Sequence, residues 1–138
     1  HMLSEESSIR SIDDLVTKKR ASKVAGIDIL EEREDVVRVL LDLERRETQI
    51  GSRLFADIVR DKLSLVTPLR RDFVKHNNFH VLKAPDMPSL LLELGFMSNP
   101  EDQARLTSVE WRKTMAASLK EAIDAWRAER GSREIASR

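Results

Sequence analysis

Glu93 has the clearest chemical potential in the sequence, because it interrupts a run of leucines over residues 89–94 just before Gly95. The run is typical of a buried strand, and desolvation would raise the pKa of an unpaired carboxylate there, which suits general acid or base chemistry. The C-terminal end of a strand is also where α/β folds place active sites. A structural carboxylate bonded to backbone amides explains the same pattern, so both interpretations stay open.

His76 and His80 form a second candidate, a His-x3-His spacing. On a helix this spacing presents two metal ligands on one face. Asn77 and Asn78 between them favour a turn instead, and His80 begins a predicted strand. With no third ligand in sight, we expect surface or packing histidines, and a metal site assembled from both across a dimer is the weaker alternative.

Glu47 is the third candidate, because it falls on an apolar helical stripe between Leu43 and Ile50. A carboxylate in that position needs a partner or a route to solvent. The simpler interpretation is an ion pair with a nearby arginine. The alternative is a functional carboxylate that faces a site.

Length and composition limit the protein class. The 138 residues suffice for one domain with a real core, and 41 % hydrophobic with 35 % charged residues is a soluble globular composition. Twenty-four basic residues balance twenty-four acidic ones, which argues against a dedicated DNA-binding protein. The absence of cysteine excludes disulfides and zinc–thiolate sites. No apolar run approaches the ~20 residues of a membrane-spanning helix, and His1-Met2 resembles a cloning remnant.

The N-terminal half is predicted to be helical. A short helix near residues 11–24 would carry a basic cluster at residues 18–20, which we expect to be a solvated face, with a partner contact as the alternative. The strongest signal covers residues 33–66, with Gly51 as a kink or a close packing contact and Pro68 as the stop. The apolar stripe of this helix has 3–4 residue spacing and consists of Val36, Leu40, Leu43, Ile50, Leu54 and Ile58.

The C-terminal half is predicted to contain two strands, at residues 79–82 and 89–94, followed by two helices. Asn99 should cap the first helix, which runs to about Leu106. A capping box from Thr107 to Glu110 should start the second, and Gly131 should end it. The buried stripe of this last helix is Trp111, Met115, Leu119, Ala122 and Trp126.

These segments carry a family resemblance. Residues 79–100 read FHVLKAPDMPSLLLELGFMSNP, and this stretch strongly resembles the C-terminal half of the zinc-dependent N-acetylmuramoyl-L-alanine amidases, the type 3 family of peptidoglycan hydrolases. Residues 106–112 match as well, and residues 41–52 resemble the helical region that precedes the motif in division-associated members. The resemblance covers residues 3–129 and is most specific over 79–112.

The resemblance implies a fold and a reaction. The fold would be α/β, with this chain as the helix-rich C-terminal part of a mostly parallel sheet flanked by helices. Glu93 would be the catalytic glutamate beside a zinc-bound water, and the amide cut would join the lactyl group of N-acetylmuramic acid to L-alanine. The zinc ligands of the family, two His and one Glu, lie upstream and match nothing here. We therefore expect zinc in the complete enzyme and none held by this chain alone, which should be inactive.

The resemblance also implies organisation and partners. Residues 3–66 would be a helical regulatory region, 67–131 the end of the catalytic domain, and 132–138 a flexible tail. Some family members insert a helix that blocks the zinc until an activator protein displaces it, and Glu47 would be a candidate blocking residue. Peptidoglycan would be the substrate, in the periplasm or elsewhere outside the cytoplasm. An exposed sheet edge would favour a homodimer or a domain swap, and the rival function is a non-enzymatic helical interaction module.

Overall fold

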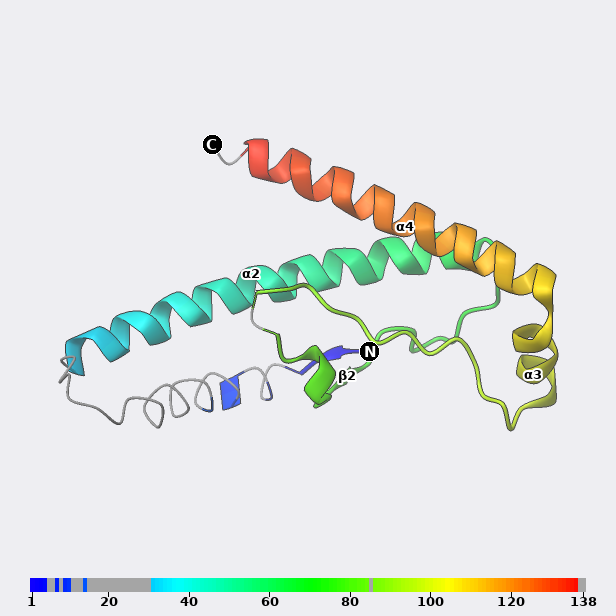
Figure 1. Ribbon diagram of the computed structural model, residues 1–138, viewed down its shortest axis with the longest axis horizontal. Coiled ribbons are helices and arrows are strands. Elements are labelled where there is room, and N and C mark those ends of the chain that lie inside the picture. The colour runs from blue at the N-terminus through cyan, green and yellow to red at the C-terminus, as the bar shows by residue number, and fades with distance from the viewer. Residues whose placement is uncertain (5–6, 8, 11–13, 15–30, 85, 137–138) are drawn as a thin grey trace.

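The computed structural model describes residues 1–4, 7, 9, 10, 14, 31–84 and 86–136, with helices as the main elements (Figure 1). The short helix and the basic cluster expected within residues 11–24 fall outside this description, apart from Asp14. In chain order the elements are β1 (Met2–Leu3), α2 (Glu31–Ser64), β2 (His76–Asn77), the 3-10 helix η1 (His80–Leu82), α3 (Pro100–Thr107) and α4 (Val109–Ala136).

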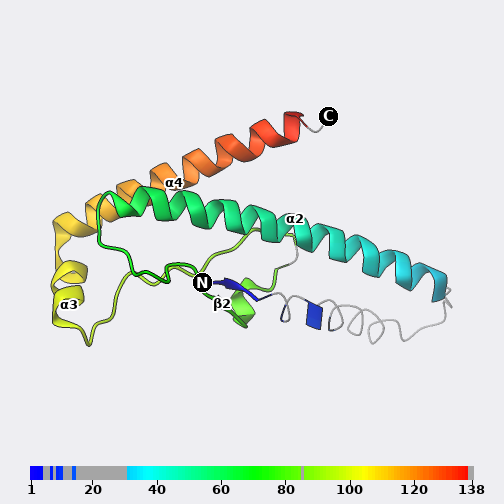
Figure 2. The same cartoon turned by 180° about the vertical axis from the view of Figure 1, so that it is seen from behind.

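The core lies where α2 and α4 cross. The two helices run in opposite directions, and the last turns of α4 diverge from α2 in both views (Figures 1 and 2). Val59 and Leu63 of α2 and Met115 and Ala122 of α4 are buried here, as the apolar spacing of both helices requires. The half-buried side chains around them are Phe55, Ile58, Val66, Leu69, Phe73, Leu90, Leu92, Trp111 and Leu119. No described helix is long and apolar enough to cross a bilayer.

The stripe predicted for α2 has the correct period, but only its C-terminal end is covered. Leu54 and Ile58 are half-buried, whereas Val36, Leu40, Leu43 and Ile50 are exposed. The buried face of α2 consists instead of Arg45, Ser52, Ala56, Val59 and Leu63. The predicted helix and its period are therefore confirmed, and the exposure of the N-terminal half of the stripe is a finding of the structure, because helical periodicity identifies an apolar face without naming what covers it.

The two predicted strands were also wrong. Residues 80–82 form η1, and residues 89–94 have no regular secondary structure. The described sheet is limited to β1 and β2, which pair in parallel with Met2 opposite His76 and Leu3 opposite Asn77. A strand needs a neighbour that completes its hydrogen-bond ladder. Within the described residues, the backbone of Leu91 bonds only to His1.

The helix boundaries near the C-terminus follow local chemistry. The Asn99 side-chain oxygen accepts hydrogen bonds from the amides of Glu101 and Asp102 at 2.9 and 3.1 Å, which confirms the predicted cap. The Thr107 capping box was wrong by one residue. Thr107 is the last residue of α3, and the Ser108 hydroxyl accepts the Trp111 amide at 3.3 Å. Gly131 does not end α4, which continues to Ala136.

Leu63→Ala should lower the free energy of unfolding by about 2–5 kcal/mol, because it opens a cavity in the core between α2 and α4. Leu63 is 2 % exposed, whereas Leu65 is 80 % exposed, so Leu65→Ala is a matched control with an expected effect within about 0.5 kcal/mol. Urea unfolding followed by circular dichroism measures both. Equal effects of the two variants would contradict this core.

Candidate active site around Glu93

A cavity of about 400 Å³ lies between α2, the 67–75 segment, the extended 90–96 segment and the start of α3. Its inner wall is apolar and includes Val59, Leu63 and Phe73. Polar groups from Glu93, Asn99 and Arg105 also line it. An apolar hollow with a few convergent polar groups is the usual form of a small-molecule site.

The Glu93 side chain is 48 % exposed, so the sequence-based expectation of a buried carboxylate was wrong. Its carboxylate lies 3.2 Å from the His1 imidazole Nε2. The His1 amino group donates to the Leu91 carbonyl, and burial lowers the pKa of that amino group while the Glu93 carboxylate partly raises it. Glu93 is thus open to solvent at the cavity, where a water molecule or a substrate can reach it.

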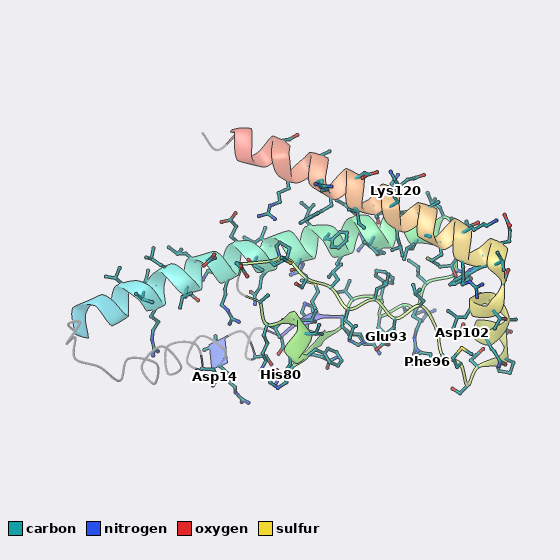
Figure 3. All side chains as sticks on the ribbon, in the orientation of Figure 1. Asp14, His80, Glu93, Phe96, Asp102 and Lys120 are labelled. Carbon is teal, nitrogen blue, oxygen red and sulfur yellow. The ribbon has the colours of Figure 1, made fainter. Side chains whose placement is uncertain are left out.

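Asp102 fixes the turn that follows Glu93, a role that the sequence analysis did not assign. One carboxylate oxygen accepts the Phe96 amide at 3.1 Å, and the other accepts Arg105 Nη1 at 3.1 Å. Gly95 has a φ of +153°, and a Cβ there would lie 3.1 Å from Asp102 Cβ. Only glycine fits this turn without strain. Figure 3 shows Glu93 and Phe96 along the extended segment that leads to Asp102 on α3.

The segment that leads into Glu93 is held on α2. The Ser52 hydroxyl accepts the Ser89 amide at 2.9 Å, and Ser52 is buried. A Cβ at Gly51 would lie 2.8 Å from Pro88 Cγ, so the absence of a side chain at Gly51 lets the proline ring touch the helix. Of the two alternatives for Gly51, the close packing contact is confirmed. The Trp126 indole also donates to the Gly51 carbonyl at 3.1 Å, which ties α4 to the same point.

Arg45 extends this attachment by nearly two helical turns toward the start of α2. Its guanidinium Nη2 donates to the Lys83 carbonyl at 3.4 Å, and the residue is 4 % exposed. Burial lowers the pKa of the Arg45 guanidinium, partly offset by Asp42. Together, Arg45, Gly51 and Ser52 hold the two ends of the 83–89 segment on one face of α2.

The other candidate residues lie apart from the cavity. His76 and His80 are exposed and do not share a helix, since His76 is in β2 and His80 begins η1. Glu47 is exposed and makes no ion pair with another described residue, so the predicted arginine partner was wrong. Its carboxylate is solvated by water instead. In the described part of the chain, no three His, Asp or Glu side chains are grouped to bind a metal ion. These residues therefore do not fit a zinc site.

Gly51 and Gly131, which lie inside α2 and α4, give a matched test of the Pro88 contact. Gly51→Ala should lower the free energy of unfolding by about 1 kcal/mol, because overpacking against the proline ring outweighs the gain in helix propensity. Gly131→Ala should stabilise by up to about 1 kcal/mol, because nothing lies within 4 Å of its Cβ position. Thermal unfolding distinguishes the two signs. Stabilisation by both variants would show that Pro88 does not rest on Gly51.

Comparison of the sequence with known proteins identifies the family. The family model described as N-acetylmuramoyl-L-alanine amidase matches residues 14–125. The chain is 34 % identical over 110 residues to N-acetylmuramoyl-L-alanine amidase AmiC of Neisseria meningitidis serogroup B. The aligned region covers 80 % of this chain and 26 % of the relative. It is 33 % identical over 91 residues to AmiC of Escherichia coli O6:H1, covering 66 % of the chain and 22 % of the relative.

A third relative is the probable N-acetylmuramoyl-L-alanine amidase AmiB of Haemophilus influenzae, 32 % identical over 89 residues, or 64 % of this chain and 21 % of the relative. The chain thus spans about a quarter of the length of these relatives. No solved structure matches it. Since the family model covers most of the chain, including the Glu93 segment and its attachment to α2, the chain belongs to the N-acetylmuramoyl-L-alanine amidase family.

Proposed function

We propose that the chain supplies the catalytic carboxylate of a peptidoglycan amidase, which hydrolyses the amide between the lactyl group of N-acetylmuramic acid and L-alanine. The observation that carries the proposal is the position of Glu93, a half-exposed carboxylate at a cavity of about 400 Å³ in the segment typical of the family. The names of the relatives support the substrate class.

Glu93 acts in this proposal as a general base and then as a general acid. Its carboxylate accepts a proton from the attacking water as the new C–O bond forms at the amide carbonyl. It then delivers the proton to the alanine nitrogen as the C–N bond breaks, and the products are a lactyl carboxylate and a free amine. Such a positioned carboxylate contributes a rate factor of about 10²–10⁴. The exposure of Glu93 supports this role, because both water and substrate must reach it.

Zinc is the metal that the resemblance implies, and an open catalytic zinc site takes three protein ligands. The described residues offer no such group. We therefore place the zinc ligands in a part of a longer protein outside these 138 residues, and we propose that this chain alone holds no zinc and does not hydrolyse peptidoglycan. The division into a helical regulatory region before residue 67 and a catalytic end after it, the activator protein and the location outside the cytoplasm belong to the same proposal.

A non-enzymatic interaction module is the second candidate function. The observation in its favour is the outward face of α2, where Val36, Leu40, Leu43 and Ile50 are exposed. Exposed apolar side chains grouped on one helix face are typical of interaction sites. The two functions predict different behaviour of the longer protein: the amidase hydrolyses peptidoglycan, whereas the interaction module does not.

The first expected outcome concerns metal content. After dialysis, elemental analysis of the purified chain should find close to zero zinc per chain, because no described cluster can hold the ion. One zinc per chain, or one per two chains, would overturn the proposal. It would direct attention to His76 and His80 as ligands.

The second expected outcome concerns Glu93 in the longer protein that includes the upstream segment. Glu93→Gln removes the proton acceptor with little change in shape, so hydrolysis of muramoyl peptides should fall by about 10²–10⁴. Glu110→Gln, at an exposed position in the first turn of α4, is the control and should retain activity. Release of the peptide from purified peptidoglycan measures both variants. No hydrolysis by the unaltered protein, with zinc bound, would favour the interaction module.

A further inference from the structure

The outward face of α2 has the spacing of a coiled-coil seam. Its members alternate steps of four and three residues, which is the heptad pattern of helices that pack along their length. The seam, as defined here, consists of Val36, Leu40, Leu43, Glu47, Ile50 and Leu54. Val36, Leu40, Leu43 and Ile50 are between 56 % and 62 % exposed, which is unusual for four large aliphatic side chains on one face.

The exposed part of the seam, from Val36 to Ile50, faces away from the buried side of α2, whereas Leu54 at its end is half-buried. At about 100° per residue, its mean direction lies about 170° from that of the buried residues Arg45, Ser52, Ala56, Val59 and Leu63. It also lies about 80° from Gly51, Phe55 and Lys62, which contact α4. Another helix can therefore lie on the seam beside α4. The cyan half of α2 extends past the end of α4 in both views (Figures 1 and 2).

We propose that the seam binds the seam of a second copy of this chain, with the two α2 helices antiparallel and the two-fold axis near the level of Arg45. This register places Leu40 opposite Ile50 of the second copy, Leu43 opposite Glu47, and Val36 opposite Leu54. Val36 and Leu40 then each meet an aliphatic side chain of the second copy, and Leu43 meets Glu47. The contact is closed and self-complementary, as a two-fold interface requires.

Charge complementarity selects the antiparallel orientation. Glu47 is the only charged residue on the seam, and a parallel pair would place the two Glu47 carboxylates side by side. In the antiparallel pair each Glu47 lies against Leu43 and within reach of Arg46 of the second copy. Arg46 is 72 % exposed and lies about 80° from the mean direction of the seam. Its guanidinium contacts Asp42 at 2.9 Å and has to leave that carboxylate to reach Glu47 of the second copy. A single polar residue in a seam commonly fixes orientation at some cost in affinity.

The size of the seam predicts a weak dimer. From Val36 to Leu54 it extends about 27 Å along the helix, which places it at the low end of specific interfaces, near or below about 800 Å² per partner. The sheet edge expected to associate is a poorer surface, because the backbone of Leu91 is already bonded to His1. We therefore expect dimers at tens of micromolar chain and monomers at about 1 µM.

Sedimentation equilibrium of the 138-residue chain from about 1 to about 300 µM tests the proposal. The mean mass should rise from 15.8 kDa toward twice that value. Leu43→Gln should raise the dissociation constant at least tenfold, because it places an amide in the seam. Leu65→Gln is the matched control: Leu65 is exposed but lies beyond the end of α2, so the dissociation constant should not change. A monomer at all concentrations, or equal effects of both variants, overturns the proposal.

Cross-linking tests the orientation, and the absence of native cysteine makes the experiment clean. Leu43→Cys and Glu47→Cys chains are mixed in equal amounts and oxidised. Antiparallel seams bring residue 43 of one copy to residue 47 of the other, so mixed disulfides should exceed half of the cross-linked product. An excess of disulfides between two Leu43→Cys chains indicates a parallel pair and overturns the register. Slow alkylation of the Leu43→Cys thiol in a monomer shows that another segment of the same chain covers the seam.

Discussion

The contact between Gly51 and Pro88 is the constraint on which most of this structure depends. With no side chain at Gly51, the proline ring lies on the helix, at a distance where a Cβ would meet Pro88 Cγ at 2.8 Å. The neighbouring Ser52 hydroxyl then accepts the Ser89 amide, and the Gly51 carbonyl accepts the Trp126 indole. One turn of α2 therefore receives both the segment that carries Glu93 and the helix α4. Leu90 and Leu92 reach the core because the chain is held at this turn.

Local chemistry was readable from the sequence, and tertiary context was not. The Asn99 cap depends on atoms within three residues, so its hydrogen bonds were predicted correctly. The helical period of α2 was also predicted, but the face that the chain covers carries Arg45 and Ser52 rather than Leu40 and Leu43. Periodicity measures which residues share a face, whereas burial depends on a neighbour far away in the sequence. Lys83 and Ser89 bond to α2 through their backbone atoms, and such contacts leave no trace in the side-chain pattern of residues 83–89.

The predicted strands failed for a related reason. Residues 89–94 have the composition of a central strand, with leucines suited to burial on both faces. A β-strand nevertheless requires a neighbouring segment, because its backbone N–H and C=O groups form hydrogen bonds with a second strand. In the described chain the backbone of this segment bonds to the backbone of His1 alone, so the segment is extended but is not part of a ladder. The structure places Glu93 at the edge of a hollow, and neither the hollow nor the exposure of the carboxylate could be inferred from the leucines beside it.

The length of α2 has a mechanical consequence. Its 34 residues form one uninterrupted helix of about 51 Å, and a continuous helix transmits displacement along its axis with little bending. The first half of this rod projects beyond α4, and the second half anchors the segment that ends at Glu93. The turn at Gly51 and Ser52 joins the two halves, because it receives both Pro88 and the Ser89 amide. A molecule that binds the projecting half therefore contacts the same continuous helix that holds the segment leading to Glu93.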